Sequence, residues 1–143
     1  MGVDADPGLV HTVIGTPANV NDVTQGHGLL HVEEALVFAD AGYQGADNRA
    51  EVTGVQWYIA LRPGKRRALD RQSPWGALLV QAERIKASVR AKVEHPFRVI
   101  TCLFGFTKVR YRGLAKNTAQ LLTLFALSNL WMARNKLAYR AAA

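Results

Sequence analysis

The chain has a single cysteine and no apolar run long enough to span a membrane. Cys102 stands alone among 143 residues, which excludes an internal disulfide framework and is typical of a reducing compartment. The most apolar window, Ala119 to Ala133, is interrupted by polar residues and falls short of the roughly 20 residues that a spanning helix needs. We therefore expect a cytoplasmic protein without a membrane partner, and we interpret this window as a core helix.

Acidic residues are scarce in the second part of the chain. Residues 57–143 carry three acidic and seventeen basic side chains, a net charge of +14, whereas residues 1–56 carry eight acidic and one basic, a net charge of −7. A segment this basic is typical of proteins that bind a polyanion, above all nucleic acid. A solvated basic surface is the alternative interpretation.

Hydrophobic patterning predicts a mixed α/β domain. Turn-forming residues at 4–8 precede the β-branched stretch 9–14, which indicates a hairpin turn that leads into a strand. Only three residues precede that turn, so we expect the chain to be the C-terminal part of a longer protein. Further elements are predicted in this order: a short helix over 20–30 capped by Asn19 or Asn21, a strand over 36–39, a polar helix over 46–52 and a strand over 55–60.

Two long helices are predicted in the basic part of the chain. The first covers residues 76–100, and Pro96 within it predicts a kink or break close to Glu94 and His95. The second begins at an Asn117 or Thr118 cap and runs to about Ala138. One face of the first helix is apolar, with steps of four, three, four and four residues between its members, and these are Leu78, Ala82, Ile85, Val89 and Val93.

Asp40 is the first candidate for chemistry. It directly follows the apolar strand 36–39 and precedes a turn bracketed by Gly42 and Gly45. Ligands of open α/β sheets gather outside the carboxyl ends of the strands, which is where this sequence places Asp40. The alternative is that Asp40 only caps the turn that follows it. Tyr43, just after Asp40, is predicted either to contact a DNA end or to pack the turn.

Glu94 is the second candidate, because it is an isolated carboxylate among cations. A ladder of surface salt bridges would explain it. Alternatively, Glu94 ligates a divalent cation beside Asp40 while arginines on either side hold phosphates, since Mg²⁺ prefers carboxylate and phosphate oxygens. Its basic neighbours are Lys86, Arg90, Lys92 and Arg98, and a separate basic loop supplies further phosphate contacts from Arg62, Lys65, Arg66 and Arg67.

Four stretches, in order along nearly the whole chain, resemble the C-terminal half of bacterial insertion-sequence transposases of the DDE class, the insertion sequence 5 group. They are Phe38–Gly45, Arg62–Arg66, Lys86–Arg98 and Val109–Asn117. The resemblance implies a ribonuclease-H-like fold, a mixed sheet with flanking helices that here lacks its first strand. It implies one partial catalytic domain over 1–143, with the sheet and its connections in 1–75 and the catalytic and C-terminal helices in 76–143.

The same resemblance implies a function and a set of site residues. Three acidic residues of the family hold two Mg²⁺ ions, with Mn²⁺ as an alternative, for DNA strand cleavage and joining. Asp40 matches the second of these residues and Glu94 the third. The implied partners are transposon ends, target DNA and a second copy of the chain, in a bacterial, nucleoid-associated protein. The predicted DNA contacts are Arg62, Lys65, Arg66, Lys86, Arg90, Arg98 and Tyr43.

The chain departs from the family's catalytic-helix pattern, Tyr-x2-Arg-x3-Glu-x6-Lys. Arg90 and Glu94 match it, but Ala87 stands at the Tyr position and Thr101 at the Lys position. The family's first acidic residue belongs upstream of the hairpin, so we expect an incomplete active site. Two other interpretations stay open: a non-catalytic DNA-binding remnant of an interrupted element, and a metal-dependent nuclease of the same fold.

Overall fold

The computed structural model describes residues 1–31, 34–49 and 54–141, and these form two compact units. The central unit comprises residues 20–91, and the terminal unit comprises residues 1–19 and 92–143. The boundary between them falls inside helix α2 (Pro74–Arg98). The prediction of one domain with an internal division at residue 75 stays a prediction.

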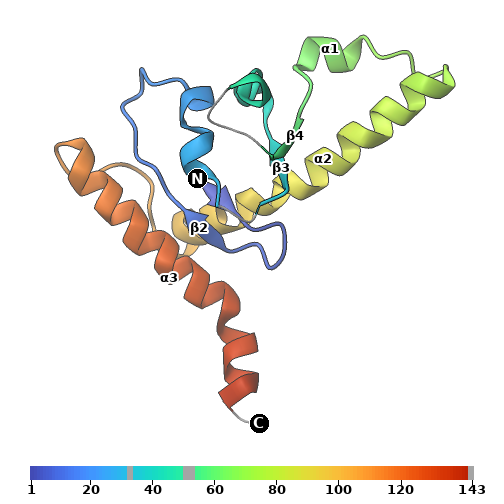
Figure 1. Cartoon of the computed structure of the whole chain (residues 1–143). Helices are drawn as coiled ribbons and strands as arrows, with labels where there is room; N and C mark the ends of the chain where they lie inside the picture. Colours follow the sequence, from blue (N-terminus) through green and yellow to red (C-terminus); the bar gives the residue numbers. More distant parts are fainter. Residues whose placement is uncertain (32–33, 50–53, 142–143) are drawn as a thin grey trace. The chain divides into compact units, whose positions relative to one another are not determined.

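The central unit is built on two parallel strands, β3 (Leu36–Ala39) and β4 (Gln56–Ile59) (Figure 1). The predicted strand 36–39 is confirmed, and the second strand lies within the predicted range. The ladder continues one step beyond the strands, because the Ala60 N–H donates to the Ala39 carbonyl at 2.9 Å. Parallel strands end at the same edge of their sheet, so Asp40 emerges beside Ala60.

Short helical turns surround this strand pair. In place of one helix over 20–30, the chain forms η1 (Asp22–Gln25) and η2 (His27–Leu29), with Gly26 between them. The predicted Asn21 cap is confirmed, because its side chain accepts from the Val23 N–H at 3.3 Å. A Cβ on Gly26 would meet the Trp57 ring at 3.2 Å, a tight contact that the ring could accept only by moving a few tenths of an ångström.

The polar helix predicted over 46–52 is described only at its start. The turn η4 (Ala46–Asn48) begins where the pattern predicts, and Ala46 is fully buried. Residues 50–52 of the predicted helix lie outside the described residues. The described turn ends at Asn48 because the backbone of Arg49 is extended, so a continuous helix over 46–52 was wrongly predicted.

Helix α2 does not break near Glu94 and His95, so a break at that position was wrongly predicted. The helix includes Pro96 and runs to Arg98, where the π-helical turn η5 (Val99–Leu103) takes over. Proline in a helix removes one hydrogen bond, yet the helix continues through Pro96, whose ring is almost completely buried. The Thr101 hydroxyl also donates to the Phe97 carbonyl at 2.8 Å and holds the turn that follows.

The apolar stripe predicted on α2 does not face the interior at its beginning. Leu78 is 58% exposed and Ile85 is 55% exposed, whereas Glu83, on another face, is only 4% exposed. Towards the end of the stripe, Val89 and Val93 are half-buried. The spacing therefore predicted the helix correctly but not the face that the central unit covers.

The terminal unit contains the predicted hairpin. Strands β1 (Gly2–Val3) and β2 (Val10–Thr12) pair antiparallel, and the Asp4 N–H donates to the Leu9 carbonyl at 2.9 Å across the turn. Val10, Ile100 and Phe125 form the core of this unit, with half-buried side chains packed around them. Two aromatic side chains, Phe104 and Phe106, are half-buried and pack against this cluster.

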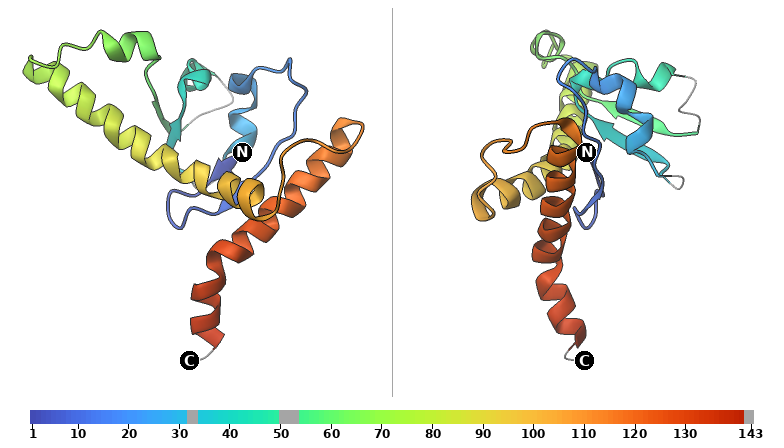
Figure 2. Two further views of the ribbon diagram at one scale, coloured as in Figure 1. Left: turned by 180° about the vertical axis from the view of Figure 1, so that it is seen from behind. Right: turned by 90° about the vertical axis from the view of Figure 1, so that its left-hand side faces the viewer.

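Helix α3 (Leu114–Ala141) starts three residues before the predicted cap. The Asn117 side chain lies in its first turn and bonds to the Tyr111 backbone instead, accepting from the N–H at 3.2 Å and donating to the carbonyl at 2.7 Å. Further along, the Asn129 amide accepts from the Val10 N–H at 2.9 Å and donates to its carbonyl at 2.7 Å. Asn129 thus pairs with β2 as a neighbouring strand would, where α3 passes the hairpin (Figure 2).

The fold is mixed α/β, as predicted. The described strands form two separate two-stranded sheets, one antiparallel and one parallel, together with the helices α1 (Pro63–Arg67), α2 and α3. The more specific ribonuclease-H-like arrangement stays a prediction. In the described part of the chain, none of the helices is both long and apolar enough for a bilayer.

Candidate active site at the end of strand β3

Asp40 lies where strand β3 ends and the turn η3 (Ala41–Tyr43) begins. Its backbone is extended, and its Oδ1 accepts a hydrogen bond from the Gly42 N–H at 2.8 Å. The capping role considered for Asp40 is therefore present. A capping bond engages one carboxylate oxygen, and an exposed ionised carboxylate has further acceptor sites that suit a hard cation.

A pocket of about 440 Å³ opens beside Asp40 within the central unit. Its wall combines the carboxyl ends of β3 and β4, the short helix α1 and one face of α2. The charged and neighbouring residues that matter here are Asp40, Arg66, Arg67, Glu83, Ala87 and Arg90. Two carboxylates and three guanidinium groups therefore border one cavity, which suits a ligand that carries both a cation and phosphate groups.

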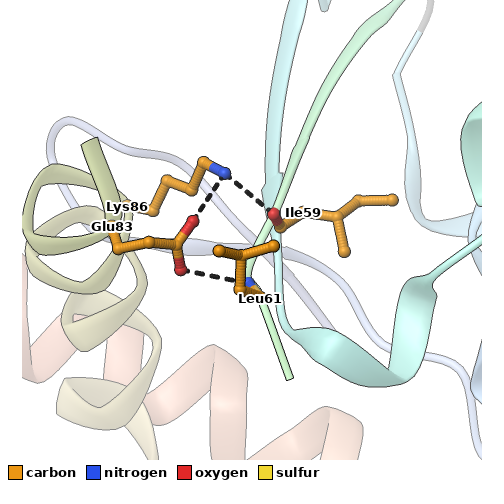
Figure 3. Close-up of polar contacts among 4 residues, drawn as sticks. All are labelled: Ile59, Leu61, Glu83 and Lys86. Carbon is orange, nitrogen blue, oxygen red and sulfur yellow. Dashed lines mark hydrogen bonds and ion pairs between the residues drawn. The ribbon is translucent and has the colours of Figure 1, made fainter. Parts of the chain in front are cut away.

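Glu83 connects α2 to the end of β4 (Figure 3). Its Oε1 accepts from the Lys86 ammonium at 2.8 Å, and its Oε2 accepts from the Leu61 N–H at 3.0 Å. The same ammonium donates to the Ile59 carbonyl at 3.0 Å. Two side chains on α2 thus bind the two backbone groups that flank Ala60.

The environment keeps Glu83 ionised. Burial by itself would raise the pKa of Glu83, but the hydrogen bonds that the carboxylate accepts and the positive charges of Lys86 and Arg66 outweigh it. The resulting pKa lies below the ordinary value of 4.5. Since both oxygens already have protein partners, Glu83 is a structural carboxylate of the pocket and not a ready metal ligand.

Glu83 was not predicted as a site residue, because Glu94 was the carboxylate of this helix that the sequence singled out. One signal was available: Glu83 and Lys86 are three residues apart, and residues at that spacing on a helix are neighbours. Lys86, predicted as a DNA contact, is half-buried and directs its ammonium to Glu83 and Ile59. Its contact with DNA stays a prediction that competes with this internal role.

Tyr43 packs the turn after Asp40, the second of its two predicted roles. Its ring stacks on Trp57 with centroids 6.4 Å apart. Burial raises the pKa of the Tyr43 phenol above its ordinary value of 10.0, and the negative charges of Asp22 and Asp40 raise it further. Two carboxylates, those of Asp22 and Asp40, therefore lie near this phenol. A DNA contact by Tyr43 stays a prediction.

The raised pKa makes a testable contribution to stability. A phenol whose folded-state pKa is raised contributes stability that is present below pH 10.0 and is lost as the pH rises through the folded pKa. Tyr43→Phe should therefore flatten the loss of unfolding free energy at alkaline pH, measured by urea unfolding between about pH 9 and 12. Tyr139→Phe, at a position that is 79% exposed, is the matched control, and an equal flattening in both variants would contradict the assignment.

The other predicted site residues fall into two groups. Arg62, Lys65 and Arg66 lie exposed on and beside α1, and Arg90 is half-buried at the pocket. Glu94 and Arg98 are exposed on the part of α2 that belongs to the terminal unit. Asp40, Arg66 and Arg90 thus share one pocket. The metal-binding and DNA-binding roles of all these residues stay predictions.

Comparison with known proteins agrees with these observations. A family model described as "Transposase DDE domain" matches residues 1–130, which is most of the chain. No solved structure matches the chain.

Proposed function

This chain belongs to the transposase DDE domain family, whose members are enzymes of DNA transposition, and we propose that it forms part of a catalytic domain of the insertion sequence 5 group. The observation that carries this proposal is the pocket at the end of β3. There Asp40, which follows a parallel strand, shares a cavity with three arginines, Arg66, Arg67 and Arg90. Phosphodiester chemistry needs that combination of an ionised carboxylate and cations that hold phosphates.

In this proposal Asp40 and Glu94, with an aspartate supplied from upstream, hold two Mg²⁺ ions. The donor set fits this metal, since the carboxylates are exposed oxygen ligands. When bound, the ions supply Lewis-acid polarisation of the scissile phosphate and of the attacking oxygen. The protein's own part is to present the oxygens of both carboxylate side chains to the ions.

The arginines have a positioning role in the proposal. Guanidinium groups bind phosphate oxygens through paired hydrogen bonds, so Arg66, Arg67 and Arg90 would hold the DNA backbone against Asp40. Such contacts fix the register of DNA without reading its sequence. The recognition of a particular transposon end therefore depends on other contacts.

A non-catalytic DNA-binding role is the second candidate. The observation that favours it is Thr101, which occupies the position of the family's lysine and donates its hydroxyl to the Phe97 carbonyl. That side chain is engaged within its own helix and carries no cation for DNA. Ala87, at the edge of the pocket, likewise lacks the hydroxyl of the family's tyrosine.

One assay separates these candidates and the related nuclease. Duplex DNA with an element end and a supercoiled target is incubated in Mg²⁺, Mn²⁺ or Ca²⁺ with the chain extended by the proposed upstream segment that carries the first aspartate, and the products are resolved on denaturing gels. Joined products in Mg²⁺ or Mn²⁺ support the transposase, and cut but unjoined ends indicate a nuclease. DNA binding that weakens steeply with salt, without cutting in any metal, contradicts catalysis and supports the binding role.

A further inference from the structure

We propose that Glu83 is a positioning residue: together with Lys86 it holds the carboxyl end of β4 on α2 and so sets where Asp40 lies relative to Arg90. This inference rests on the proposed function, because Asp40 is its metal ligand and Arg90 its phosphate contact. Neither Glu83 nor Lys86 needs to touch substrate in this role.

The connection from Glu83 to Asp40 is short and lies within the central unit. The Glu83 carboxylate binds the Leu61 N–H at 3.0 Å, and the preceding residue, Ala60, donates its N–H to the Ala39 carbonyl at 2.9 Å. Ala39 is covalently followed by Asp40. A displacement of Leu61 is therefore transmitted to Asp40 through one strand-to-strand hydrogen bond and two peptide bonds.

The connection from Glu83 to Arg90 runs along one face of α2. Residues three and four apart on a helix lie above one another, so Glu83, Lys86 or Ala87, and Arg90 follow in successive turns. Glu83, Ala87 and Arg90 all border the pocket, as this spacing requires. The attachment of the Glu83 turn to the end of β4 thus fixes the rotation of α2 and the place where Arg90 reaches the cavity.

The Glu83 carboxylate is a buried ion, and its burial is better explained by the geometry that it imposes on β4 and α2 than by stability alone. The Glu83 side chain is only 4% exposed, and an apolar side chain of similar size would fill this space without having to lose its hydration. An apolar side chain would not bind the Leu61 N–H, and it would leave Lys86 without its carboxylate. The pair instead binds two backbone groups, the Leu61 N–H and the Ile59 carbonyl, while Glu83 and Lys86 also bind each other.

Glu83→Gln in the full chain is the test. Glutamine has nearly the same shape, but its amide has a single oxygen in place of the two carboxylate oxygens that accept from the Leu61 N–H and the Lys86 ammonium. Lys86→Met removes the other partner, and Arg84→Gln, an exposed neighbour on the same helix, is the control. The first readout needs no metal: the amide NMR signal of Gly42 reports on its hydrogen bond to Asp40 Oδ1. We expect this signal to shift in Glu83→Gln and Lys86→Met and to stay unchanged in Arg84→Gln.

The second readout is the affinity for Mn²⁺, measured by electron paramagnetic resonance. Loss of a residue that orients a metal ligand typically weakens binding about 10-fold or more, and we expect a loss of this order in Glu83→Gln while the chain remains folded by circular dichroism. If the two substitutions act through one linkage, the double variant should be little worse than either single one.

The positioning role of Glu83 and the proposed function are contradicted by different results. An unchanged Gly42 signal in both folded variants would overturn the positioning role, whatever the metal does. A Mn²⁺ affinity of Glu83→Gln equal to that of the parent would overturn it as well. A parent chain that binds Mn²⁺ no better than its Asp40→Asn variant would instead count against the proposed function.

Discussion

With the proposed upstream aspartate restored, replacing Asp40 with asparagine should lower metal-dependent strand cleavage by at least about 1,000-fold, because a lost ligand removes several kcal/mol of transition-state stabilisation. Asparagine has nearly the same shape and can still accept the hydrogen bond from the Gly42 N–H, so the turn after β3 should persist. The variant is therefore expected to fold and bind DNA as the parent does. Denaturing gels of end-labelled DNA give the rate, and fluorescence anisotropy gives the affinity.

Two further variants complete this experiment. Glu94→Gln is expected to cause a loss of similar size, because Glu94 is the proposed partner ligand. Asp47→Asn removes an exposed carboxylate of the central unit in η4 and should leave cleavage unchanged. If Asp40→Asn or Glu94→Gln cleaves as fast as the parent, that residue is not a metal ligand.

Removing two pocket arginines should weaken DNA binding strongly and make it less dependent on salt. Each phosphate that a protein neutralises contributes about 0.9 to the slope of log affinity against log salt. Arg66→Gln combined with Arg90→Gln is therefore expected to reduce that slope by about 1.8 and the affinity by about 30- to 100-fold near 0.1 M salt. Anisotropy titrations between about 50 and 200 mM salt measure both quantities.

The matched control removes the same charge elsewhere. Arg134→Gln combined with Lys136→Gln acts on exposed positions of α3 in the terminal unit and should change the slope little. Equal losses in the α3 variant and the pocket variant would show that the pocket is not the DNA contact.

Features that depend on neighbouring residues could be predicted from the sequence. Strand β3 was predicted over Leu36–Ala39 because an apolar run of this length ends at a carboxylate and a glycine. Asn21 was predicted as a cap because its short side chain reaches the N–H two residues on. The hairpin at residues 4–8 follows from its turn-forming composition.

Features that depend on distant residues were missed or misjudged. Asn117 was expected to begin the last helix, but it instead binds Tyr111, six residues earlier. Pro96 was expected to kink or break α2 close to Glu94 and His95, yet the helix continues through this residue, whose ring is buried in the terminal unit. Neither outcome could be read from helix propensity, since tertiary packing decides both.

The sequence by itself determined two local elements around the site: a carboxylate at the end of a strand and a long helix that carries Arg90 and Glu94. The basic loop predicted at residues 62–67 instead forms the short helix α1. Only the tertiary structure decided which face of that helix meets β4. The periodic apolar stripe of Leu78 and Ile85 faces solvent, while the buried position belongs to Glu83. The physical reason is that a backbone N–H and a carbonyl at the end of β4 need partners, and a carboxylate and an ammonium can satisfy them where an apolar side chain cannot.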